Sequence, residues 1–171
     1  MRKLKKLPQR IYVAVSGGVD SVVLLHFLKR HHDVTVVHYI HDSDYSETEF
    51  EFVADLCSDW KLPLLVEKQK PTYKPGESRE NYWRNGRYGF FHSLDAEVCV
   101  GTTLDDAVEW YLFSCLRGQG HYMKYQNKNV VKPLLVLKKR ELLDYAAEHK
   151  LVWLEDPSNA DVSFARRNCI R

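Results

Sequence analysis

A six-residue segment between a strand and a helix constrains this chain more than any other feature. Residues 11–15 form an apolar run with the length of a buried strand, and residues 20–30 have a helical pattern. The segment between them is Ser16-Gly17-Gly18-Val19-Asp20-Ser21. Adjacent glycines let the backbone approach a ligand, and a helix start offers unpaired N–H groups and the positive end of its dipole. This segment, the phosphate loop, therefore predicts a phosphate-binding site.

The rest of the chain alternates short apolar runs with helical patterns. Further strands are expected at 34–39, 64–66 and 97–100, and further helices at 46–60, 78–92, 104–116 and 138–149. This alternation predicts an α/β fold: a doubly wound, mainly parallel sheet flanked by helices. Ligands of such sheets bind outside the carboxyl ends of the strands, where the phosphate loop lies. We expect residues 1–171 to form a single domain, with a basic lead over residues 1–10.

The helix expected at 104–116 has the clearest periodicity. Its apolar residues form one stripe at helical spacing: Leu104, Ala107, Val108, Tyr111, Leu112, Cys115 and Leu116. We expect Cys115 to be buried, like two of the other cysteines. Thr103 fits the N-cap of this helix, with Asp106 at the third helical position. Ser46 and Glu49 predict a capping box for an earlier helix in the same way.

Acidic residues near the strand ends predict a metal-assisted site. A carboxylate beside phosphates is unfavourable unless a cation joins it, so Asp20 implies Mg²⁺. Asp105, Asp106 and Glu109 follow the fourth strand and should reach the same edge. We expect these four acids to be catalytic, and Asp20 and Asp105 to hold the metal. The alternative is that they only complement the dipoles of their helices.

The composition disfavours several other classes of protein. No apolar run approaches the ~18–20 residues that span a membrane, and no secretory pattern opens the chain, so we expect a cytoplasmic protein. The four cysteines form no C-x-x-C pair, which disfavours zinc, iron–sulfur and dithiol chemistry. The net charge of +2 is modest. Its basic clusters could contact a phosphate backbone or form solvated surface.

Several strings in this sequence, taken together, resemble one enzyme family. The phosphate loop is similar to that of the PP-loop, or N-type ATP pyrophosphatase, superfamily of adenine nucleotide α-hydrolase-like fold. The strings that narrow the resemblance are Glu80-Asn81-Tyr82-Trp83-Arg84-Asn85-Gly86-Arg87-Tyr88, Leu104-Asp105-Asp106, Lys132-Pro133-Leu134-Leu135, Glu155-Asp156-Pro157-Ser158-Asn159 and Arg167-Asn168-Cys169-Ile170-Arg171. In that order they look like the N-terminal catalytic domain of the tRNA(Ile)-lysidine synthetases.

This resemblance implies an activity, cofactors and partners. Such an enzyme uses ATP and Mg²⁺ to adenylate C2 of the wobble cytidine in isoleucine tRNA and releases pyrophosphate; free lysine then displaces AMP, which makes it a C–N ligase. The resemblance implies that ATP contacts Ser16, Gly17, Gly18, Val19, Asp20, Ser21, His41, Arg84 and Gly101. It implies that the substrate contacts Glu80, Arg84, Arg87, Arg117, Asp156, Asn159, Arg167 and Asn168.

The chain departs from the family pattern near the expected substrate. Thr102-Thr103 stands where the family usually has a histidine pair, and Ile40 replaces an asparagine. These differences bear on the target base and the amine nucleophile. The alternatives are another PP-loop enzyme, for tRNA thiolation or small-molecule amidation, and an inactive tRNA- or nucleotide-binding module. The further tRNA-gripping domains of the family are expected to be absent, which predicts weak tRNA binding and a possible homodimer.

Overall fold

The computed structural model describes residues 6–70, 76 and 78–155, apart from the side chain of Glu80. The elements alternate as expected: β1 (Arg10–Ala14), α1 (Val19–Leu28), β2 (Asp33–Ile40), α2 (Ser46–Trp60), β3 (Leu64–Lys68), α3 (Arg79–Ser93), β4 (Val98–Val100), α4 (Leu104–Leu116), β5 (Gln126–Asn127), β6 (Val130–Val131) and α5 (Lys139–Glu148). The sequence analysis did not anticipate β5 and β6, because two-residue strands leave no periodic pattern.

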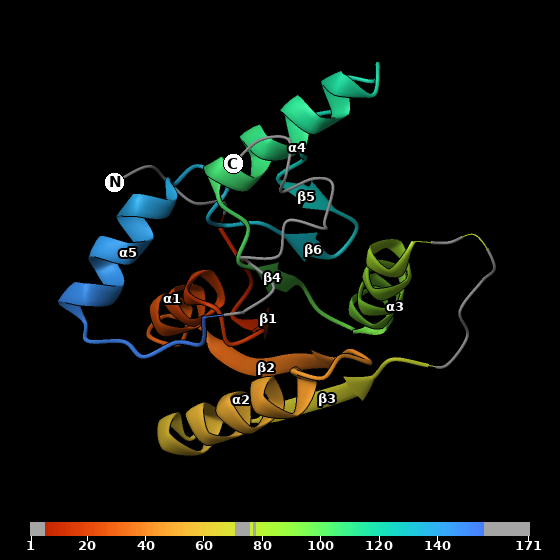
Figure 1. Cartoon of the computed structure of the whole chain (residues 1–171). Helices are drawn as coiled ribbons and strands as arrows, with labels where there is room; N and C mark the ends of the chain where they lie inside the picture. Colours follow the sequence, from red (N-terminus) through yellow and green to blue (C-terminus); the bar gives the residue numbers. More distant parts are fainter. Residues whose placement is uncertain (1–5, 71–75, 77, 156–171) are drawn as a thin grey trace.

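The strands form one sheet in the order β3-β2-β1-β4-β6-β5. All neighbouring strands are parallel except β5 and β6, which confirms the predicted α/β class (Figure 1). The chain first builds outward from β1 to β2 and β3, and then returns to place β4 on the other side of β1. Strand order therefore reverses between β1 and β4, and such a switch point is where open α/β sheets bind ligands.

Alternate residues of the strands build a core on each face of the sheet. Ile11 and Val13 of β1 pack on one face with buried residues of α1, α2 and α5. Tyr12 points to the other face, where Phe91 of α3 covers it. Helices on both faces make this a doubly wound sheet and fix its strand ends. Among the residues that the structure describes, no helix combines the length and apolar character that crossing a membrane requires.

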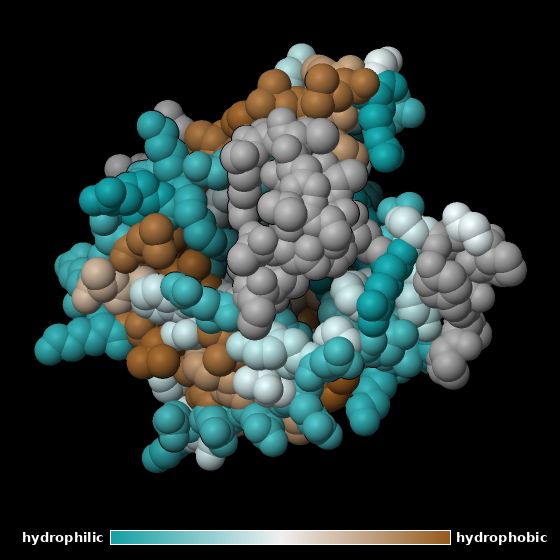
Figure 2. Space-filling model, viewed as in Figure 1, coloured by the Kyte–Doolittle hydropathy of each residue, from teal (hydrophilic) through white to brown (hydrophobic). Residues whose placement is uncertain are grey.

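Helix α4 departs from what its sequence pattern predicts. Its capping box, formed by Thr103 and Asp106, is confirmed. The expected burial of Cys115 is wrong, because that residue is exposed. Much of the apolar stripe is exposed too, as the brown surface along α4 in Figure 2 shows: Val108 is 50%, Tyr111 46%, Leu112 45% and Leu116 71% exposed. The reason is that α4 extends beyond the short strands β4 and β6, where little sheet remains to cover it (Figure 1).

The predicted capping box of α2 is also wrong. Tyr45 is the N-cap of this helix, and no side-chain hydrogen bond from the described residues caps it. Ser46 is already helical, and its hydroxyl donates to the carbonyl of His41 at 2.6 Å. A serine hydroxyl can bond several nearby backbone groups, so spacing alone does not identify its partner.

Candidate nucleotide site

The phosphate loop joins β1 to α1 at the switch point of the sheet. Gly17 has φ +92°, a conformation that glycine adopts without strain. Its carbonyl accepts a hydrogen bond from the backbone N of Leu154 at 3.0 Å. Gly18 is the N-cap of α1, and in the described part of the chain no side-chain hydrogen bond caps that helix end. Among the described residues, a Cβ on Gly18 would meet only the Ser16 Oγ, at 3.9 Å, so this part of the chain leaves the space over the helix start open.

The two serines of the loop differ in their surroundings. Ser16 is exposed, whereas Ser21 is buried. The Ser21 hydroxyl donates to the Gly18 carbonyl at 2.8 Å and accepts from the Ser16 backbone N at 3.3 Å. Ser21 therefore holds the loop in shape from within, and Ser16 is the serine that faces outward.

Gly101 brings the end of β4 against the phosphate loop. A Cβ at this position would lie 2.9 Å from both the Asp20 carbonyl carbon and the Ser21 backbone N. Backbone atoms cannot yield as a flexible side chain does, so the contact requires glycine. It sets the start of α4, which carries Asp105 and Asp106, close to Asp20.

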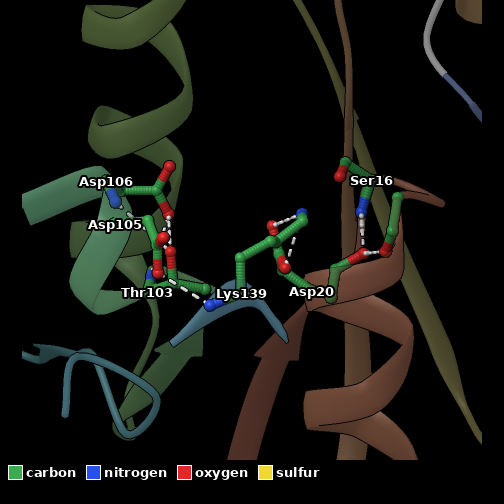
Figure 3. Close-up of polar contacts among 8 residues, drawn as sticks. Ser16, Asp20, Thr103, Asp105, Asp106 and Lys139 are labelled. Atoms are coloured by element: carbon green, nitrogen blue, oxygen red, sulfur yellow. Dashed lines mark hydrogen bonds and ion pairs between the residues drawn. The ribbon is translucent and has the colours of Figure 1, made fainter. Parts of the chain in front are cut away.

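Lys139 links the two acidic groups at this edge, and Figure 3 shows it between them. Its Nζ lies 2.7 Å from Oδ1 and 2.6 Å from Oδ2 of Asp20. Its backbone N donates to Oδ2 of Asp105 at 2.7 Å. Asp106 has a different role, because its carboxylate accepts from the backbone N and the hydroxyl of Thr103, each at 2.8 Å. Asp20 and Asp105 thus flank Lys139, while Asp106 closes the start of α4.

The charge balance of the site favours cations. Burial raises the pKa of Asp20 above its ordinary value; the Lys139 ammonium opposes this shift, and the Asp106 and Asp105 carboxylates reinforce it. Glu109, the fourth expected acid, lies one turn further along α4. Among the described residues, no group of three or more His, Cys, Asp and Glu side chains could hold a metal ion. Mg²⁺ beside phosphate oxygens commonly uses only one or two protein carboxylates, and Asp20 and Asp105, which both contact Lys139, are two carboxylates at one edge of the sheet.

His41 lies just beyond the carboxyl end of β2. Its ring contacts those of Tyr39 and Trp83, with centroids 5.2 and 5.3 Å apart. Burial, followed by the nearby charge of Arg87, lowers the pKa of His41 to about 4. Its buried Nδ1 has no hydrogen-bond partner within the described residues. His41 therefore presents a neutral imidazole with one unsatisfied nitrogen, and Arg87 lies beside it.

The structure separates the two remaining arginines. Arg84 of α3 lies over the ring of Trp110 in α4, with its Cζ 5.3 Å from the ring centroid. Arg117 is the C-cap of α4, with its Cζ 4.6 Å from the Phe113 ring. At 1.5 Å per residue it is about 18 Å along the helix from Asp105. Arg84 therefore bridges two helices of the site, whereas Arg117 lies at the far end of α4.

Some expected residues are not described, and two cations were missed. Outside the described residues lie Asp156, Asn159, Arg167, Asn168 and the side chain of Glu80. Sequence reasoning placed Lys139 only in a basic cluster that could contact a phosphate backbone or form solvated surface, because its partner Asp20 is 119 residues away. Lys132 was noticed in the same basic cluster and in a family string. It is buried, its Nζ donates to the Lys124 carbonyl at 3.2 Å, and burial lowers its pKa.

Comparison with known sequences relates the whole chain to one domain family. The profile of a family described as a PP-loop domain matches residues 1–171. The tRNA(Ile)-lysidine synthase of Nitrosomonas europaea is 36% identical, over 92% of this chain and 38% of its own length. That of Vibrio cholerae is 30% identical (97% and 42%), and that of Lactiplantibacillus plantarum is 32% identical (96% and 41%). The chain spans about two fifths of the length of these relatives.

Solved structures with little sequence identity share the fold. NMN synthetase from Francisella tularensis aligns with a TM-score of 0.60 at 16% identity, over 84% of this chain and 62% of that one. The NH3-dependent NAD synthetase from Campylobacter jejuni aligns with a TM-score of 0.56 at 18% identity, over 84% and 65%. At such identities the likeness concerns the arrangement of sheet and helices alone.

Proposed function

This chain belongs to the PP-loop family, and from that premise we propose that it binds ATP with the phosphates over Gly17, Gly18 and the start of α1. The observation that carries this proposal is the N-terminus of α1 behind Gly18, which no described side chain caps or covers. The φ of Gly18 is an ordinary −69°, so the backbone conformation does not require glycine there. What glycine provides is space, and the first amides of a helix beside that space suit an anionic ligand.

The adenine is proposed to lie near the end of β2, next to His41. The neutral imidazole there has a buried nitrogen without a partner in the described chain. A polar ligand atom that bonded to this nitrogen would remove the cost of leaving it unsatisfied. This position and the phosphate loop lie at the carboxyl ends of β2 and β1, which are neighbours in the sheet.

Asp20 and Asp105 are the residues that would hold Mg²⁺. When bound, the ion would neutralise charge on the phosphates and favour the departure of pyrophosphate. The carboxylate of Asp106 is already engaged with Thr103, so its part is to keep the start of α4 in place. Ser21 has the same kind of part in the phosphate loop, because its hydroxyl bonds that loop internally.

The reaction we propose is the modification of a tRNA base. It is supported by similarity to tRNA(Ile)-lysidine synthases along more than nine tenths of the chain. The C2 oxygen of the wobble cytidine would attack the α-phosphorus of ATP, and the bond to pyrophosphate would break. The amine of free lysine would then attack C2, and AMP would leave with the oxygen. The exposed Arg84 is suited to contact a tRNA phosphate, because it projects from α3 over Trp110.

A tRNA-dependent labelling assay tests this function. The protein is incubated with ATP, Mg²⁺, bulk tRNA and radiolabelled lysine, and AMP, pyrophosphate and labelled tRNA are measured. We expect the three products in equal amounts and only when tRNA is present. Adenylation of a small metabolite with no response to tRNA would overturn the lysidine reaction and leave the nucleotide site standing.

The position of the phosphates is tested separately by ATP binding. Gly18→Val fills the open space over α1, so it should abolish ATP binding measured by calorimetry while thermal unfolding stays close to wild type. Gly89→Val is the matched control, because a Cβ on that helical glycine meets no other described residue within 4 Å. Undiminished ATP affinity in Gly18→Val would refute the placement.

A further inference from the structure

Lys139 holds a place between the two carboxylates that the proposed function assigns to a metal. Its ammonium contacts both oxygens of Asp20, and its backbone N contacts Asp105. An ion bound by Asp20 and Asp105 would need part of the space and of the carboxylate lone pairs that Lys139 now uses. The ammonium and a divalent cation are therefore competitors for Asp20.

The backbone and side chain of Lys139 differ in how firmly they are fixed. Lys139 is the first residue of α5, which is anchored in the core by the buried Leu142 and Ala146. Its backbone N is bonded to Asp105. The side chain is 41% exposed and ends in an ammonium on a flexible four-carbon stem. The backbone of Lys139 is thus fixed at the site, while its ammonium group can change partners.

We propose that Lys139 is an exchanging counter-ion, which neutralises Asp20 in the nucleotide-free site and turns to a phosphate oxygen of ATP when a metal ion takes Asp20. This inference rests on the proposed ATP site. It gives Lys139 the role of a positioning cation in the complex with nucleotide. The ammonium contacts Asp20 alone, and the Asp105 and Asp106 carboxylates lie close enough to Asp20 to act on its charge, so negative charge around Asp20 exceeds that of one ammonium.

A purely structural ion pair is the competing explanation. Exposed or half-exposed pairs contribute about 0–1 kcal/mol to stability. A structural role predicts that removing the charge lowers stability slightly and shifts metal and nucleotide affinity in the same direction or not at all. An exchanging counter-ion predicts opposite shifts, because the ammonium competes with the metal and assists the phosphate.

The first test uses the isosteric, uncharged variant Lys139→Met. The affinity of the nucleotide-free protein for Mn²⁺, measured by electron paramagnetic resonance, should rise by about fivefold as a competing cation is lost. The affinity for ATP with Mg²⁺, measured by calorimetry, should fall by about tenfold as a charge-assisted hydrogen bond is lost. Lys139→Arg keeps the charge and should shift both affinities less. Arg140→Met is the matched control, because that exposed side chain on the same helix pairs with Asp144.

The second test uses wild-type protein and so does not depend on the folding of a variant. Acylation of Lys139 by a water-soluble succinimidyl ester is followed by mass spectrometry of peptides. Mn²⁺ alone should expose the displaced ammonium and increase labelling, whereas ATP with Mg²⁺ should protect it. Equal labelling of the protein alone, with Mn²⁺ and with ATP and Mg²⁺ would overturn the proposed exchange. So would a fall in both the Mn²⁺ and the ATP affinity of Lys139→Met. Failure of the ATP site itself would appear instead as a lack of ATP binding by the wild type.

Discussion

Helices α1 and α4 follow the neighbouring parallel strands β1 and β4 at the same edge of the sheet, but α1 is mostly buried and α4 is mostly not. Each carries carboxylates in its first turn, Asp20 in α1 and Asp105 and Asp106 in α4. Seven of the ten residues of α1 are buried, whereas Ser114 is the one buried residue of α4. Both helices are rich in apolar residues, so composition does not explain the difference.

The neighbours of each helix explain it. α1 packs on the centre of the sheet beside α5, in a core that also includes α2. α4 follows β4, which has three residues, and the next strand in the sheet, β6, has two. No residue of α4 joins either core cluster in the described part of the chain. The apolar stripe of α4 therefore marks a face that could be buried. It stays exposed because the adjoining strands β4 and β6 are too short to cover it.

The N-termini of the two helices differ in a way that matters for function. α1 begins at Gly18, where no side-chain cap is present among the described residues, and α4 begins at Thr103 within a complete capping box. A helix start without a side-chain cap is the one suited to phosphates. The start of α4 is capped by its own side chains, and it contributes the carboxylates of Asp105 and Asp106 to the site instead.

Truncating one leucine in each helix should give the largest contrast. Leu25→Ala removes a fully buried side chain from α1 and should lower the free energy of unfolding by about 3 kcal/mol. Leu112→Ala truncates a side chain of α4 that is 45% exposed, and should cost less than about 1 kcal/mol. Urea denaturation followed by circular dichroism measures both. Equal losses would mean that the α4 face is buried in solution, which would break the comparison.

The same contrast shows what sequence reasoning could reach. The strand–loop–helix arrangement around residues 16–21 and the capping box of Thr103 and Asp106 are local patterns, so residue spacing was enough to predict them. The exposure of Cys115 was missed because periodicity does not reveal what a stripe meets. The pairing of Lys139 with Asp20 joins α5 to α1 across 119 residues and leaves no local signal. The order of the main helices and strands was therefore predictable, whereas individual side-chain partners were predicted unevenly, since one of the two expected capping boxes is wrong.

Adding one methyl group to each of two glycines tests how tightly the two helix starts are built together. Gly101→Ala places a Cβ 2.9 Å from backbone atoms of Asp20 and Ser21, and should destabilise the fold by about 1–3 kcal/mol. Gly18→Ala meets open space at an ordinary φ, and should be neutral or stabilising by about 0.4–1 kcal/mol. Chemical denaturation of both variants checks the signs. A loss in Gly18→Ala as large as that in Gly101→Ala would show that the space over α1 is not open.

Removing the cap of α4 should have the smallest effect and should leave the nucleotide site working. Thr103→Ala deletes the hydroxyl that accepts from the Asp106 backbone N and donates to its carboxylate, and caps of this kind contribute about 1 kcal/mol. Thr103→Ser is the control, because it keeps the hydroxyl. ATP affinity should stay within about twofold of wild type, since the phosphates are assigned to the start of α1 and lost caps act mainly on helix stability. A large drop in ATP affinity with little change in unfolding would instead place the α4 terminus in contact with the nucleotide, and the division of roles between the two helices would fail.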